Sequence, residues 1–176
     1  MMTQDSVAPA RPLPPHRLVR HPAIDLIGIE ARFTPQDSPR IAQQWRHFMT
    51  RHVEIASAAP QPPLACAHLH PDASFDYLCA VQVTEPSTPP EGMVLRRLPD
   101  SEYAVFRHAG PVSTIRQTMQ AILDPWVLFR PLARPPLVLE LFLQQFDPAT
   151  GEGGVDIWVA LAPASQSGLA FPATGC

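Results

Sequence analysis

The chain has 176 residues, of which 45% are hydrophobic and 16% are charged, so it can bury the core of one globular domain or of two small fused halves. Its formal net charge is -3 and no run of Lys or Arg occurs, which argues against direct binding of nucleic acid. No apolar stretch suits a signal peptide or a membrane span, and the three cysteines indicate reduced thiols rather than a disulfide framework. We therefore expect a soluble protein of the cytoplasm.

Proline marks the turns of the chain and the limits of its folded part. The 23 prolines crowd into residues 9–22, 60–63, 86–90 and 131–136, each between apolar segments. The two ends of the chain have no periodic pattern. We expect a disordered Pro-rich tail over residues 1–20, one folded domain over residues 21–163 and a flexible tail over residues 164–176.

The first predicted elements are a strand, a helix and a second strand. The segment 23–33 ("AIDLIGIEARF") predicts a strand. Ser38 and Pro39 then fit the N-cap and the first position of a helix. The stripe of this helix that faces the core holds Ile41, Trp45, Phe48, Met49 and His52. The segment 74–83 ("SFDYLCAVQV") predicts the strand that follows.

A second half follows the same plan. Residues 102–109 ("EYAVFRHA") predict a strand, residues 112–129 predict a helix that Pro125 ends or kinks, and residues 137–146 and 155–162 predict two strands. The stripe of the helix holds Ile115, Met119, Ile122 and Trp126. Ile41 and Ile115 are 74 residues apart, which indicates a duplication with halves over about 24–90 and 91–163. The predicted fold class is α+β, with two βαββ modules in one curved antiparallel sheet and both helices on one face.

Several segments of the chain resemble the GyrI-like small-molecule-binding domains, which also form the effector-binding half of AraC-type and MerR-type multidrug-responsive regulators. The resemblance rests on "LIGIEARF", "QQWRHFMTRH", "FDYLCAVQV", "PPEGMVLRRLPDSEYAVFRHAGPVSTIRQTMQAILDPW" and "LELFLQQFDPATGEGGVDIWVAL". It implies a stand-alone effector-binding domain whose cleft, between the two halves, binds lipophilic, often cationic or aromatic compounds. It also implies that Glu140, in "LEL", lies in this cleft.

Two departures from the family pattern affect the expected site. The family usually has a Leu-Pro and a Ser-Gly turn after the helix tryptophan, where this chain has "WVLFRPLARPP". It usually has a tyrosine two residues after the glutamate, where this chain has Phe142. We therefore expect a different cleft rim and one fewer hydroxyl beside Glu140.

Glu140 is a single acid in an apolar strand, where an unpaired carboxylate is costly. Alternation of side chains places Val138, Glu140 and Phe142 on one face of the sheet, and we assign the leucines between them to the helix side. In the last strand, the same reasoning leaves Trp158 on the face of Glu140. We expect both to face one cleft. The alternative is that Glu140 faces solvent or pairs with Arg96, Arg97 or Arg107.

An acid surrounded by aromatic rings suits a hydrophobic cation, because charge attraction, cation–π contacts and apolar area act together. Our candidate ligand-binding residues are Glu140, Trp158, Tyr103, Phe142 and Trp126. Phe106 is a further candidate ring, although alternation also allows it and Trp126 to lie in the core. Trp45 is interpreted as a core residue.

The segment "CAHLH" sets out three metal-ligand types, Cys66, His68 and His70, with Asp72 after them. In a strand, alternate side chains are about 7 Å apart per step, which is too far for all three to reach one tetrahedral ion. We therefore predict no metal site. Because the chain also lacks a nucleophile elbow, a P-loop and a dinucleotide fingerprint, we predict no cofactor and no catalytic activity.

The leading functional hypothesis is a small-molecule-binding protein with Glu140 at the centre of its site. The first alternative is a hydrolase of cyclopropane-bearing electrophilic natural products, with Glu140 as general acid or base and Tyr103 assisting. The second alternative is a protein that acts on another protein, such as gyrase or a separate transcription regulator.

Overall fold

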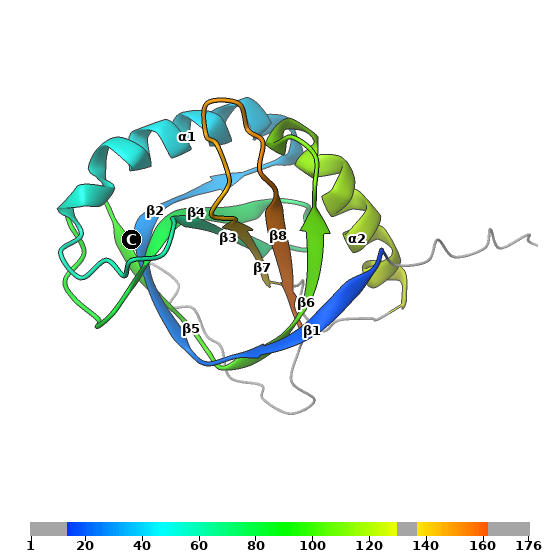
Figure 1. Cartoon of the computed structure of the whole chain (residues 1–176), viewed down its shortest axis with the longest axis horizontal. Coiled ribbons are helices and arrows are strands. Elements are labelled where there is room, and N and C mark those ends of the chain that lie inside the picture. The colour runs from blue at the N-terminus through cyan, green and yellow to red at the C-terminus, as the bar shows by residue number, and fades with distance from the viewer. Residues whose placement is uncertain (1–13, 130–136, 162–176) are drawn as a thin grey trace, which may run out of the picture.

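The computed structural model describes residues 14–129 and 137–161, in which eight strands form one curved antiparallel sheet with two α-helices on one face (Figure 1). The helices are α1 (Ser38–Arg51) and α2 (Ile115–Phe129). The strands are β1 (His16–His21), β2 (Ile24–Phe33), β3 (Leu64–Leu69), β4 (Phe75–Val83), β5 (Val94–Leu98), β6 (Ser101–His108), β7 (Leu137–Phe142) and β8 (Val155–Ala160). The predicted α+β class and sheet type are confirmed.

The strand order β1-β6-β8-β7-β3-β4-β2-β5 contains one pattern twice, joined at the pair formed by β7 and β3. The first copy is β2-α1-β3-β4 and the second is β6-α2-β7-β8. The two copies begin at Ile24 and Ser101, and their helices begin at Ser38 and Ile115, both 77 residues apart. The predicted duplication is therefore confirmed, with an offset of 77 residues instead of 74.

The sheet curls because β5 and β6 follow each other in the chain but lie near opposite edges of the sheet. Only Pro99 and Asp100 connect Leu98 at the end of β5 to Ser101 at the start of β6, a link that spans about 10 Å. In a flat sheet, six strand spacings of about 4.8 Å would separate these strands by about 29 Å. The short link therefore requires the bend that Figure 1 shows, with β5 and β1 brought to the same side.

Both faces of the curled sheet are buried. On one face, which we call the helix-covered face, Phe106 and Ile157 of the sheet pack with Phe48 of α1 and Ile122 of α2. The other face lies inside the curl, and we call it the inner face. Its core holds Leu26, Leu64, Leu78, Leu98, Tyr103, Val105 and Leu139.

The orientation of β7 is the reverse of the prediction. Val138 belongs to the core of the helix-covered face and Leu139 belongs to that of the inner face. Because side chains alternate along a strand, Glu140 lies on the helix-covered face with Val138. The prediction was wrong because the curl buries the inner face as well, so the more apolar row of side chains does not identify the helix side.

Several element boundaries also differ from the prediction. Residues 16–20, expected in the N-terminal tail, belong to β1, whose side chains are mostly exposed and therefore carry no clear apolar pattern. β5 was likewise not predicted. The residue at the N-cap of α1 is Asp37 instead of Ser38, and α2 continues past Pro125 to Phe129. None of the helices in the described ranges is long and apolar enough to cross a membrane.

Candidate functional site

Glu140 lies in β7, at the centre of the sheet. Its neighbours on the adjacent strands are Ala65 of β3 and Ile157 of β8. Only 8% of its surface is exposed, so an ionised carboxylate here loses most of its contact with water. Such a group requires partners inside the protein or a proton of its own.

The hydrogen-bond partner of Glu140 is Tyr77, which lies on β4, two strands away. The hydroxyl of Tyr77 donates to Oε2 of Glu140 at 2.8 Å, and Tyr77 is 4% exposed. The strand between them, β3, presents Ala65 and Ala67 on this face. The contact spans two strand spacings of about 4.8 Å each, and these small side chains leave the tyrosine room to reach across.

α1 contributes the next hydrogen bond of this network. Nε1–H of Trp45 donates to the hydroxyl of Tyr77 at 3.1 Å, so the hydroxyl accepts from the helix and donates to the carboxyl group. The preceding residue, Gln44, donates through Nε2 to the backbone oxygens of Ile29 at 2.8 Å and Tyr77 at 2.9 Å. These bonds tie α1 to β2 and β4, and they connect the helix to Glu140 through Tyr77.

Burial is the main influence on the pKa of Glu140. Loss of water raises this pKa above its ordinary value, while the hydrogen bond from Tyr77 and the charge of His108 act in the opposite direction. Burial, followed by the negative charge of Glu140, raises the pKa of Tyr77 well above its ordinary value. Tyr77 is therefore a neutral hydroxyl donor, and burial favours the protonated form of Glu140 more than it would for an exposed glutamate.

The predicted alternative partners of Glu140 are bound elsewhere. Arg96 pairs with Glu30, Arg97 with Asp25 and Arg107 with Asp156. Within residues 14–129 and 137–161, no salt bridge includes Glu140. The carboxyl group is neither exposed nor locked to one of these three arginines.

Of the other predicted site residues, Phe142 lies on the same face as Glu140. Its ring centroid is 5.3 Å from that of Trp45 and 4.6 Å from that of Phe146. Trp126 belongs to α2, but its side chain lies outside the described residues, so its role stays a prediction.

Trp158 and Tyr103 lie on the inner face, with ring centroids 5.5 Å apart. Trp158 is opposite Leu139 in the register of β7 and β8, whereas Glu140 is opposite Ile157. The prediction that Glu140 and Trp158 face one cleft was therefore wrong. It turned the wrong face of β7 toward the helices, although the alternation of side chains within each strand was correct.

Tyr77 was not predicted as a site residue, and Trp45 was predicted to lie in the core alone. One signal was available, because a tyrosine inside the apolar strand "FDYLCAV" needs a partner for its hydroxyl. The identity of that partner depends on a contact 63 residues along the chain, which no local pattern reveals.

Comparisons with known proteins agree with this fold. The GyrI-like small molecule binding domain matches residues 14–162. The transcriptional regulator BrlR of Pseudomonas aeruginosa is 30% identical over 148 residues, which make up 82% of this chain and 54% of BrlR. This chain thus spans about half the length of that relative.

Two solved structures share the fold at low sequence identity. SAV2435, solved bound to tetraphenylphosphonium, has a TM-score of 0.66 and 19% identity over 83% of this chain and 93% of that chain. The C-terminal domain of EcmrR has a TM-score of 0.57 and 13% identity over 83% of this chain and 96% of that chain. Together with the match over residues 14–162, these findings show that the chain belongs to the GyrI-like small-molecule-binding domain family.

Proposed function

We propose that this domain is a receptor for lipophilic cationic or aromatic molecules, which it binds on the helix-covered face with Glu140 at the centre of the site. The observation that carries the proposal is a buried carboxyl group, hydrogen-bonded by Tyr77, whose charge no ion pair among the described residues balances. Membership of a small-molecule-binding family supports a small molecule as the ligand, and the acidic side chain favours a positive charge on that ligand.

The raised pKa of Glu140 explains why the ligand-free protein is stable with an acidic group buried in its core. Without a ligand, the carboxyl group tends to hold its proton and avoids the cost of a buried charge. A bound cation stabilises the ionised form, because attraction between opposite charges is strong where water is excluded. The rings of Trp45 and Phe142 adjoin this network, and each cation–π contact would add about 0.5–2 kcal/mol.

The relatives support the same choice of ligand and suggest a setting for it. SAV2435 was solved with tetraphenylphosphonium, which is a lipophilic cation. BrlR, which resembles this chain in sequence, is a transcriptional regulator, and EcmrR, which resembles it in fold, was solved in complex with DNA. We infer that this domain senses its ligand on behalf of a regulatory partner or sequesters it. The thiols of Cys66 and Cys79 are unpaired, which is consistent with our placing the protein in the cytoplasm.

Titration of the purified protein with tetraphenylphosphonium, followed by calorimetry, tests the proposal. We expect Glu140→Gln to weaken binding at least about tenfold, since it removes the charge but keeps a hydrogen-bond acceptor for Tyr77. The matched control is Glu102→Gln, which removes the same charge from an exposed position of β6. Triphenylphosphine oxide, which has aromatic rings but no net charge, should bind the wild type more weakly than the cation does.

The affinity should also depend on pH. Because the cation favours the ionised form of Glu140, binding should strengthen as the pH rises, by at most about tenfold per pH unit, until the carboxyl group is ionised without ligand. The dependence should be absent in Glu140→Gln. Equal affinities of the wild type and Glu140→Gln at every pH would refute the role of Glu140.

A hydrolase remains the second candidate, because a carboxyl group with a raised pKa can act as a general acid. The structure changes its expected machinery: Tyr103, proposed as the assisting group, lies on the inner face, so Tyr77 is the hydroxyl available to Glu140. Product analysis with a cyclopropane-bearing electrophile tests this candidate. It requires turnover in the wild type above that of Glu140→Gln.

A further inference from the structure

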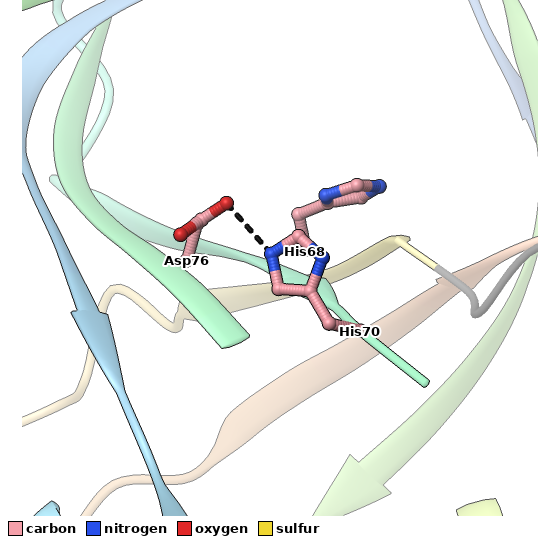
Figure 2. Close-up of side chains that lie close together, drawn as sticks. All are labelled: His68, His70 and Asp76. Carbon is pink, nitrogen blue, oxygen red and sulfur yellow. Dashed lines mark hydrogen bonds and ion pairs between the residues drawn. The ribbon is translucent and has the colours of Figure 1, made fainter. Parts of the chain in front are cut away.

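Three side chains of metal-ligand type gather where β3 turns into β4, on the side of the sheet away from Glu140. His68 and Asp76 are direct partners in the register of these two strands, and they lie two residues from Cys66 and Leu78 of the inner-face core, which places them on that face. His70 follows just beyond the end of β3. Figure 2 shows the imidazole of His70 facing the carboxylate of Asp76, with the ring of His68 beside it.

The hairpin brings together residues that the sequence pattern placed too far apart. The predicted separation of about 7 Å between His68 and His70 assumed one continuous strand. Instead, the backbone N–H of His70 donates to the carbonyl oxygen of Ser74 at 2.8 Å, which closes the turn and brings the two imidazole centroids to 5.0 Å. The negative prediction for metal binding concerned Cys66, His68 and His70, and it did not consider Asp76 across the hairpin.

The members of the cluster are not those that the sequence suggested. Cys66 is buried in the inner-face core, and burial raises the pKa of its thiol to about 12. Asp72 accepts hydrogen bonds from the backbone N–H and the hydroxyl of Ser74, at 3.0 and 2.6 Å. Asp76, which was not among the predicted ligands, takes the third position because it pairs with His68 across the hairpin.

The geometry of the cluster suits a transition-metal ion. One ligand atom from each of His68, His70 and Asp76 can be chosen so that all lie within 4.8 Å of one another. A tetrahedral zinc ion holds its ligand atoms about 3.4 Å apart, so closure requires shifts of about 1.5 Å or less. The side chains of His70 and Asp76 are 21% and 28% exposed, which leaves them accessible to an ion from solvent. Two imidazoles and a carboxylate favour Zn²⁺ and its neighbours over Mg²⁺ or Ca²⁺.

A positive group already occupies this position. Arg32 donates to both carboxylate oxygens of Asp76, at 2.8 and 3.2 Å, and its NH2 lies 2.9 Å from Nε2 of His70. His70 Nε2 in turn lies 2.7 Å from Asp76 Oδ2. The side chain of Arg32 is 60% exposed, so it can move into solvent. A dication and this guanidinium cannot share the site, because both need the same carboxylate and repel each other.

We propose that His68, His70 and Asp76 form a binding site for Zn²⁺ or a similar divalent transition-metal ion, and that Arg32 occupies the site in the ion's absence. The ion displaces the guanidinium, is held by two imidazole nitrogens and one carboxylate oxygen, and completes its coordination with water. This site is separate from Glu140, since the two lie on opposite faces of the sheet.

Zinc binding by purified protein without an affinity tag, measured in competition with a chromogenic chelator, tests the proposal. All variants carry Cys176→Ser, because a terminal thiol is itself a zinc ligand. We expect one ion per chain. His70→Ala and Asp76→Asn should each weaken binding at least about tenfold, whereas His47→Ala, which removes an exposed imidazole from α1, should leave it unchanged.

Arg32→Gln separates this proposal from general binding of metal to surface histidines. Loss of the competing guanidinium should strengthen zinc binding by at least about twofold, because the ion no longer has to break a surface ion pair. Weaker or unchanged binding in Arg32→Gln would overturn the competition, and equal binding by the wild type and His70→Ala would overturn the site. Far-ultraviolet circular dichroism of each variant checks that the protein is folded, so that differences in zinc binding are compared between folded proteins.

Discussion

Replacement of Tyr77 by phenylalanine tests the network around Glu140 while it preserves the shape of the core. The hydroxyl group that is removed makes two hydrogen bonds, a donation to Glu140 at 2.8 Å and an acceptance from Trp45 at 3.1 Å. A hydrogen bond to a charged group contributes about 1.5–3 kcal/mol and a neutral one about 0.5–1.5 kcal/mol. The free energy of unfolding should therefore fall by about 2–4.5 kcal/mol where Glu140 is ionised.

The size of this loss should depend on pH. The hydrogen bond from Tyr77 lowers the pKa of Glu140, which means that it stabilises the ionised form more than the protonated form. Tyr77→Phe should therefore cost more at about pH 9 than at about pH 5, as measured by urea unfolding. Tyr103→Phe, which removes a buried hydroxyl from the inner face, is the matched control. A cost below about 0.5 kcal/mol at both pH values would refute the network.

Three further substitutions test the surroundings of the site. Because the folded pKa of Glu140 is raised, its protonated form stabilises the wild type fully below a pH of 4.5, and this stability is lost as the pH rises through the folded pKa. Glu140→Gln lacks this pH dependence, so the wild type should lose stability relative to the variant over that range in urea unfolding. The absence of such a relative loss would contradict the burial argument. Ala65→Leu fills the space between Glu140 and Tyr77, so urea unfolding should show a loss of about 1–3 kcal/mol, and calorimetry should show weaker binding of tetraphenylphosphonium. Gly28→Ala should yield unfolded or insoluble protein by circular dichroism, because the new Cβ would overlap the carbonyl oxygen of Cys79; a melting temperature equal to that of the wild type would contradict this.

The features that the sequence predicted correctly are those encoded by local patterns. Both helices, the strands β2, β4, β6, β7 and β8, and the duplication follow from apolar spacing along the sequence. β1 and β5 were missed because they are short strands at the edges of the sheet, stabilised mainly by backbone hydrogen bonds to β6 and β2. Backbone pairing leaves little trace in side-chain composition.

The site was only partly predictable for a related reason. The buried acid at position 140 was recognisable from its apolar neighbours and from the family resemblance. Its surroundings depend on which strands are adjacent and on their register, as the placement of Trp158 opposite Leu139 illustrates. Similarly, His68 and Asp76 meet only because the chain turns between them. Contacts between distant segments decide the chemistry of both sites, and alternation along a single strand does not reveal them.

Tyr77 supplies Glu140 with the hydroxyl group that Phe142 lacks. A tyrosine two residues after the glutamate would approach from along β7, about 6.8 Å away in the strand direction. Tyr77 instead approaches from the side, and the indole N–H of Trp45 occupies the acceptor side of its hydroxyl, so the hydroxyl proton is directed at Glu140. A ligand that drew the carboxylate away from Tyr77 would break the bond between β4 and β7, while the bonds of Gln44 and Trp45 would still hold α1 to β2 and β4.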